Sequence, residues 1–345
     1  MKRRYWLLAT VGLALGLGIP LFLGGGELGP ALGRLSWTWL TILLLLVFLG
    51  WNLNAGRLRL LAGGVGTRLG QGRALATTMA TEFAICATPG GAGGPVTYAW
   101  LLSRRGLPLP RGLALYAVDQ LMDMLFFLSA LIALFLYWLL VPSDLHLGWQ
   151  ISVLGGLLMG GLGLIWLLTR YYRIVALASG RLLRRLRISP ARRRRLARWV
   201  VEFRHSLRLV RHFSRRRLLG VYLLCVGHWL LRYSLLYLAI AGLGGGVSWS
   251  YAFVTQMLSL AAGQATLLPG GSGGVEASSV LLLAPYLDSA TTAAAILVWR
   301  FTTFYWYLIA GAPVFAVLAG RSLWRRLAGN GAGSESGANN RASNP

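Results

Sequence analysis

The sequence contains two matching glycine-rich motifs: Pro89-Gly90-Gly91-Ala92-Gly93-Gly94 and Pro269-Gly270-Gly271-Ser272-Gly273-Gly274. Each interrupts an apolar region, 74–103 and 250–287 respectively. Glycine adopts backbone angles that other residues avoid, and proline lacks the N–H that continues a helix. Both motifs therefore predict a break between two helical segments. Because the motifs match, the sequence also predicts that one structural unit occurs twice.

The composition around these motifs is that of a membrane protein. Hydrophobic residues make up 56% of the 345 residues and charged residues only 12%, whereas soluble domains carry about 25% charge. A helix needs about 20 apolar residues to cross a bilayer. Six stretches meet that length and predict an all-α polytopic membrane protein: 5–23, 36–54, 112–141, 149–169, 218–241 and 289–319.

The distribution of positive charge predicts the orientation of these spans. The chain carries 34 Lys and Arg against 9 Asp and Glu. Of these bases, 31 lie at the termini and in alternate connections, including Arg57, Arg59, Arg68 and Arg73 after the second span. Only Arg34 lies in the opposite connections, which are 24–35, 142–148 and 242–249. The positive-inside rule predicts a multi-pass protein of the cell (inner, cytoplasmic) membrane with both termini in the cytoplasm. Since topology explains this charge, we expect no nucleic-acid partner.

This sidedness makes each interrupted region return to the face from which it started. Region 74–103 has cytoplasmic arginines at both ends, and region 250–287 must start and end outside, because the last span ends at Arg321. Most of the halves are too short for an ordinary span at about 1.5 Å per residue. We therefore expect two re-entrant helical hairpins, one from each face. Two similar units of opposite orientation form an inverted repeat, as in many secondary transporters.

Six charged residues fall inside the predicted membrane segments, where ionisable groups usually mark function or a compensating pair. They are Glu82, Asp119, Asp123, Arg232, Glu276 and Arg300. One interpretation is a set of buried ion pairs, for example Asp119 or Asp123 with Arg300. The other is a polar cavity in which Arg232 and Arg300 bind an anionic headgroup while the acids bind its cationic part or protons. Both interpretations stay open.

Other polar residues extend this candidate site. His228 shares a helix face with Arg232, four residues further on, although a buried histidine with a protein partner is the competing interpretation. A polar stripe at helical spacing runs down the second hairpin, through Gln256, Ser259, Gly263 and Thr266. The two glycine motifs are expected to line the same cavity, with close packing of small residues as the alternative.

Catalytic and metal-binding patterns are absent from the sequence. Cys86 and Cys225 lie far apart in apolar stretches, which excludes a cysteine-based zinc site. No lysine follows either glycine run, so neither is a nucleotide-binding P-loop. We expect neither enzyme activity, nor a metal, nor a cofactor.

Two further segments lie outside the predicted spans. The basic insert 170–217 contains an amphipathic pattern through Leu196, Trp199, Phe203 and Leu207, which predicts a helix on an anionic membrane surface. It also offers a docking site for a cytoplasmic enzyme, so the alternative function is a non-transporting scaffold for a lipid- or glycan-modifying enzyme. The tail 321–345 is rich in small polar residues and predicts disorder, which leaves one transmembrane domain over 1–320.

The two motifs and the helices behind them resemble the lysylphosphatidylglycerol synthase transmembrane-region family, also described as flippase-like membrane proteins. The resemblance is carried by Pro89–Gly94, Tyr116–Asp123, Pro269–Glu276 and Trp299–Arg300. It implies a flippase that moves an anionic or zwitterionic phospholipid, or a lipid-linked intermediate, through a central polar cavity. In the full-length synthases a separate cytoplasmic domain makes the aminoacylated lipid. Only a short tail follows the last predicted span, so lysine transfer is not expected.

Overall fold

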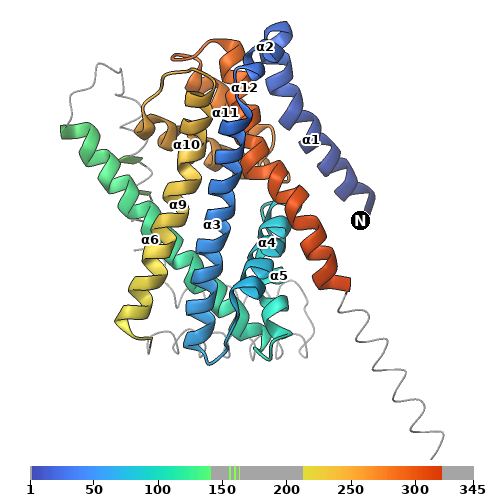
Figure 1. Cartoon of the computed structure of the whole chain (residues 1–345), viewed down its shortest axis with the longest axis vertical. Coiled ribbons are helices and arrows are strands. Elements are labelled where there is room, and N and C mark those ends of the chain that lie inside the picture. Colours follow the sequence, from blue (N-terminus) through green and yellow to red (C-terminus); the bar gives the residue numbers. More distant parts are fainter. Residues whose placement is uncertain (1, 141–154, 157–158, 161–162, 164–212, 321–345) are drawn as a thin grey trace, which may run out of the picture. The chain divides into compact units, whose positions relative to one another are not determined.

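The computed structural model describes residues 2–140 and 213–320, with a few residues between them (155, 156, 159, 160 and 163). Within this part every regular element is a helix (Figure 1), which confirms the predicted all-α class. The helices are α1 (Lys2–Gly24), η1 (Gly25–Glu27), α2 (Leu28–Gly33), α3 (Trp37–Gly64), α4 (Gln71–Ala87), α5 (Gly93–Ser103), α6 (Leu109–Leu140), α9 (Arg215–Gly242), α10 (Trp249–Thr266), α11 (Gly274–Leu283), α12 (Ser289–Arg300) and the π-helical segment η2 (Phe301–Tyr305). Helical structure then continues over 306–320.

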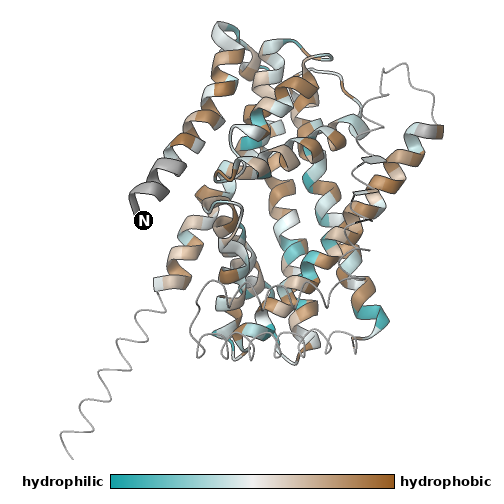
Figure 2. Ribbon diagram, turned by 180° about the vertical axis from the view of Figure 1, so that it is seen from behind, coloured by the Kyte–Doolittle hydropathy of each residue, from teal (hydrophilic) through white to brown (hydrophobic). Residues whose placement is uncertain are grey.

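Five helical stretches in the described residues are long and apolar enough to cross a membrane. They are Thr10–Gly33, Trp37–Gly64, Leu109–Trp138, Arg215–Gly242 and Ser289–Gly320. Apolar residues cover most of the length of these helices (Figure 2). They match five of the six predicted spans. The remaining span, 149–169, lies largely outside the described residues, as do most of the insert 170–217 and all of the tail 321–345.

Residues 24–35, which the sequence predicts as a connection, are largely helical. The chain passes from α1 through the 3-10 turn η1 into α2, and it bends at Gly25, which has a φ of +50°. Leu28 and Ala31 are buried, and α2 packs against α12. Glycines lower helix propensity by up to about 1 kcal/mol each, but this burial outweighs them. The first apolar helical stretch therefore continues to Gly33, beyond the predicted end of its span at residue 23.

The chain divides into two compact units. Unit 1 comprises Met1–Ala55, Gln71–Thr97 and Leu231–Pro345, and unit 2 comprises Gly56–Gly70 and Tyr98–Leu230. Three helices, α3, α5 and α9, contribute residues to both units. The expectation of a single domain over 1–320 stays a prediction.

Both glycine motifs interrupt the helices, as the sequence predicts. The first separates α4 from α5 and the second separates α10 from α11. Gly90 and Gly91 have φ values of +57° and +69°, and Gly270 and Gly271 have +63° and +66°. In each motif the amide of the second glycine donates to the carbonyl three residues earlier, at 3.1 Å in the first and 3.0 Å in the second. The motifs thus form the same turn, which favours glycine at two consecutive positions.

The two motifs meet in unit 1, although 180 residues separate them in the sequence. Pro89 and Pro269 pair in an isolated antiparallel β-bridge. Each motif also caps an amide where its second helix begins. Thr88 Oγ1 accepts from the Gly93 amide at 2.8 Å, and Glu276 Oε2 accepts from the Gly273 amide at 2.6 Å. Side chains next to the motifs therefore satisfy these two helix-terminal amides.

The helices around the second motif pack closely. In unit 1, α10 contacts α11, and α11 contacts both α12 and α1. Gly263 on α10 faces the second motif, because a Cβ at this position would collide with Val275 and lie 2.9 Å from the carbonyl oxygen of Gly271. One turn away, the Ser279 hydroxyl donates to Ser259 Oγ at 2.9 Å. The second motif is consequently held between helices on both sides.

Candidate functional site

A buried ion pair joins the second glycine motif to α12. The Nε atom of Arg300 lies 2.7 Å from Oε1 of Glu276, and the two side chains are 3% and 0% exposed. Arg300 Nη2 also donates to the Gly270 carbonyl at 3.0 Å and to Ser272 Oγ at 3.3 Å. The guanidinium lies 4.5 Å from the centroid of the Phe304 ring. Arg300 is therefore fully engaged in holding the motif in place.

The π-helical segment η2 follows Arg300 directly and completes this arrangement. It carries Phe304, whose ring occupies the space that a side chain at Gly270 would need. Such π-helical turns are rare and occur frequently at functional sites. Here the segment positions an aromatic ring against both Arg300 and the backbone of the motif.

A second ion pair of unit 1 joins α9 to α4. Arg232 Nη1 lies 3.9 Å from Glu82 Oε2, and the side chains are 18% and 15% exposed. The same Nη1 donates to the Tyr307 hydroxyl at 2.9 Å, and the guanidinium lies 4.8 Å from that ring's centroid. Asn54 Nδ2 donates to the other oxygen of Glu82 at 3.4 Å.

A third cluster lies within unit 2, where Arg57 faces two aspartates. Its Nη2 atom lies 2.7 Å from Oδ1 of Asp119 and 2.7 Å from Oδ1 of Asp123. Asp123 Oδ1 also accepts hydrogen bonds from the Trp229 indole at 2.7 Å and the Cys225 thiol at 3.3 Å. One helix face presents both aspartates, as their spacing of four residues predicts. Arg57 is 2% exposed, so the cluster is a buried structural contact between α3, α6 and α9.

These pairings correct two predictions. Asp119 and Asp123 do not pair with Arg300, whose partner is Glu276. Arg57 lies buried within α3 rather than in a connection, because α3 continues past the predicted end of its span to Gly64. The sequence contains a signal for this extension: Leu58, Leu61 and Ala62 continue the apolar pattern after Arg57, and all three are buried.

Two further predicted residues are buried against other protein groups. Gln256, on α10, is 1% exposed and donates to the backbone carbonyl of Tyr233. His228 is 2% exposed and stacks edge-on against Trp229, with ring centroids 5.1 Å apart. Neither belongs to a metal-binding cluster, because no group of three His, Cys, Asp or Glu with that geometry occurs in the described part of the chain.

Among the three arginines of these pairs, Arg232 has the most exposed side chain and the longest ion pair. Its side chain is 18% exposed, against 3% for Arg300 and 2% for Arg57. Its separation from Glu82, 3.9 Å, is also longer than the 2.7 Å of the other pairs. Arg232, Glu82, Tyr307 and Asn54 therefore form the candidate binding site, in which Tyr307 and Asn54 were not predicted. Tyr307 follows the π-helical segment η2, whose wider turn changes which residues share a helix face, so its spacing from Arg300 does not predict its position in the site.

The apolar helices, together with charged residues buried among them, define a multi-pass membrane protein. The family model for the lysylphosphatidylglycerol synthase TM region matches residues 9–311, and the chain belongs to this family. It is also similar to a UPF0104 membrane protein of Archaeoglobus fulgidus, with 24% identity over 288 residues that cover 81% of this chain and 86% of that protein. The family resemblance seen in the glycine motifs is thereby confirmed.

Proposed function

We propose that this protein is a flippase, which carries a phospholipid or a lipid-linked intermediate across the cytoplasmic membrane. The observation that supports this most is the partly exposed Arg232–Glu82 pair in the apolar helices of unit 1. An ionisable pair at membrane depth is costly unless it is tightly compensated or used. This pair is long and open to a ligand, which suits a site for a charged headgroup.

The chemistry of the pair defines what the site takes. Arginine binds a phosphate through several N–H donors in a fixed geometry. A headgroup phosphate would replace Glu82 as the anionic partner of Arg232, and the Tyr307 hydroxyl would stay within reach of the same donors. Glu82, held by Asn54, is then left to bind the cationic part of a zwitterionic headgroup or a proton. Since one anion replaces another, Arg232 stays paired in both states, which avoids the cost of an unpaired buried charge.

The two glycine motifs act as the gate in this proposal. Region 74–103 enters from the cytoplasmic face and region 250–287 from the outer face as re-entrant hairpins of an inverted repeat, with both termini in the cytoplasm. Support comes from the matched turns of the motifs and from their contact at Pro89 and Pro269. Separating this contact would open a path for the headgroup, in the manner of alternating access between inverted repeats. The Arg300–Glu276 pair keeps the internal conformation of the second motif unchanged while the motif moves as a unit.

Proteoliposomes that contain fluorescent phosphatidylglycerol in both leaflets test the proposal. Chemical reduction of the outer-leaflet dye measures how fast lipid exchanges between leaflets. Arg232→Gln removes the charge and is expected to slow exchange about tenfold or more, because a hydrogen bond to a charged group contributes about 1.5–3 kcal/mol. Arg34→Gln is the matched control, since Arg34 is exposed in unit 1 and lies outside the site.

The outcome is read together with the melting temperature of each variant in detergent. Slow exchange by Arg232→Gln at an unchanged melting temperature, with wild-type exchange by Arg34→Gln, supports the site. Exchange by Arg232→Gln at the wild-type rate overturns the role of Arg232. A wild-type protein that exchanges neither phosphatidylglycerol, phosphatidylethanolamine nor a polyprenyl phosphate overturns the flippase proposal itself.

A further inference from the structure

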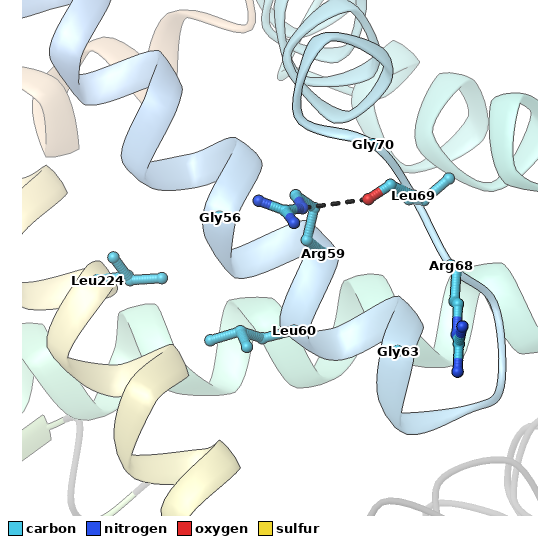
Figure 3. Close-up of a pocket in the computed structure, with 8 residues that line it drawn as sticks. All are labelled: Gly56, Arg59, Leu60, Gly63, Arg68, Leu69, Gly70 and Leu224. Carbon is cyan, nitrogen blue, oxygen red and sulfur yellow. Dashed lines mark hydrogen bonds between the residues drawn. The ribbon is translucent and has the colours of Figure 1, made fainter.

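Unit 2 contains a pocket that includes none of the ion-paired residues described above. Its volume is about 580 Å³, and it opens beside the last turns of α3 and the loop that follows them. The pocket is lined by the helix residues Arg59 and Leu60, by the loop residues Arg68 and Leu69, by Leu224 and by several glycines. Figure 3 shows that Arg59 comes from α3, Arg68 from the loop and Leu224 from α9. Pockets of this volume are typical of sites for small molecules.

Glycines create the space, and the loop backbone is held across it. A Cβ at Gly63 or Gly70 would meet nothing within 4 Å, so each missing side chain leaves room in the pocket. Arg59 Nε donates to the Leu69 carbonyl at 3.1 Å, and this hydrogen bond fixes the loop next to the helix (Figure 3). Leu69 is buried. One side of the pocket is thus bordered by a loop whose backbone is hydrogen-bonded to α3.

The lining is complementary to an amphipathic anion. Arg59 and Arg68 are both exposed, and no Asp or Glu lines the pocket. Leu60 and Leu224 provide an apolar wall beside them. A group with a negative head and an apolar body satisfies both parts of this lining, whereas a free inorganic anion would use only the arginines.

The length of α3 places the pocket near the membrane surface. The helix has 28 residues, or about 42 Å at 1.5 Å per residue, which exceeds the roughly 30 Å of the hydrocarbon core. Its final turns, with the basic residues that the positive-inside rule assigns to the cytoplasm, therefore extend into the headgroup region. Anionic phospholipids are attracted to clusters of basic residues at that depth.

We propose that this pocket binds an anionic phospholipid, with its phosphate at Arg68 and Arg59 and an acyl chain against Leu60 and Leu224. The site is additional to the proposed transport site, since unit 2 contains all of its residues while Arg232 and Glu82 belong to unit 1. A lipid held here would remain bound whether or not another lipid is being moved.

Photocrosslinking tests the assignment in phosphatidylcholine vesicles that contain phosphatidylglycerol with a diazirine on its acyl chain. After irradiation, mass spectrometry of peptides measures label in residues 56–70. Arg68→Gln removes one charge and is expected to reduce this label about fivefold, because a basic residue near the membrane surface contributes about 1 kcal/mol. Gly63→Leu fills the pocket without a backbone clash and is expected to abolish the label.

Two control variants distinguish binding in this pocket from nonspecific attraction of lipid and from binding at the transport site. Arg73→Gln removes an exposed arginine that does not line the pocket and is expected to leave the label unchanged. Arg232→Gln tests the transport site and is also expected to leave it unchanged, so the two proposals can fail independently. Wild-type label in both Arg68→Gln and Gly63→Leu overturns the lipid site. An equal loss of label in Arg73→Gln also overturns the site, because it indicates nonspecific attraction by positive charge. Competition by inorganic phosphate overturns it as well, because it indicates a site for a free anion.

Discussion

Asp123 is the residue at which buried polar contacts converge in unit 2. A single oxygen accepts from the Arg57 guanidinium, the Trp229 indole and the Cys225 thiol. Its side chain is 12% exposed, whereas that of Asp119, the other partner of Arg57, is 21% exposed. The two aspartates are one helical turn apart, yet they differ in how much of the local structure depends on them.

Replacing these aspartates separately should show that difference. Asp123→Ala removes the acceptor of the Trp229 N–H and one of the two acidic partners of Arg57, so we expect a loss of about 3–5 kcal/mol in stability, the usual cost of breaking a buried pair. Asp119→Ala leaves Arg57 paired with Asp123 and should cost clearly less. Thermal unfolding in detergent measures both variants. Equal losses would contradict the assignment of Asp123 as the centre of the cluster.

Asp288 makes a testable contact outside the spans. Its carboxylate accepts from the Thr291 amide at 2.8 Å at the start of α12, and this hydrogen bond lowers the pKa of Asp288 below its ordinary value. A lowered pKa means that the folded state favours the carboxylate. The contribution to stability is therefore present above the unfolded pKa of about 3.9 and is lost as the pH falls through the folded pKa.

Two substitutions at this position separate charge from capping. Asp288→Ala removes the cap and should lower stability by about 0.5 kcal/mol at pH 7, the low end for an exposed N-cap. Asp288→Asn keeps an accepting oxygen and should retain most of the stability at pH 7 while losing its dependence on pH below 4. Unfolding measured at pH 3 and pH 7 checks this. Wild-type pH dependence in Asp288→Asn would assign that dependence to another group.

At the scale of the elements, the hairpin of α10 and α11 depends on the absence of a side chain at Gly263. The second glycine motif packs against this residue so closely that a methyl group cannot fit without moving Val275 or the Gly271 backbone. Because Pro269 of this motif pairs with Pro89, a displacement of α11 would also disturb the contact between the two motifs.

The comparison of two glycines tests this dependence. Gly263→Ala should destabilise the protein by about 1–3 kcal/mol, the usual cost of overpacking. Gly18→Ala, on α1, introduces the same methyl group where nothing lies within 4 Å. This control should be neutral or stabilising by up to about 1 kcal/mol, because alanine loses less backbone entropy on folding. Melting temperatures that fall equally in both variants would show that helix propensity, not packing, is the cause.

The same elements show what sequence patterns predict at this scale and what they miss. Both helix breaks follow from local properties of Pro89 and Pro269 and of the glycines after them, and the structure contains both. The end of α3 does not follow from local properties of the sequence. The sequence predicts it near residue 54, whereas the helix ends at Gly64. The charge of Arg57 by itself predicts the end of a membrane span. In the structure its two aspartate partners on α6 compensate this charge, so Arg57 can lie in a buried part of the helix. A partner remote in sequence cannot be read from the pattern around the arginine.

For the whole molecule, the orientation in the membrane is the property that the basic residues predict. Gly246, between α9 and α10, should face outward, and Arg105, between α5 and α6, should face the cytoplasm. Both positions are exposed, and Cys86 and Cys225 are buried and should react poorly. In intact cells an impermeant maleimide should label Gly246→Cys and not Arg105→Cys. Labelling of Arg105→Cys before the cells are opened would reverse the predicted orientation.

The sequence alone determined the membrane class, the helical content, the two interrupted regions and the family, because these depend on composition, on the period of apolar residues and on short motifs. The distribution of the charges among partners depends instead on the three-dimensional packing of the helices. Arg300 pairs with Glu276 at the second motif, and Arg57 pairs with Asp119 and Asp123. The pair of Arg232 with Glu82 is the partly exposed one of the three. The reason is physical: a buried charge is stabilised by whichever opposite charge lies within a few ångströms, and packing of helices that are distant in the chain determines that distance.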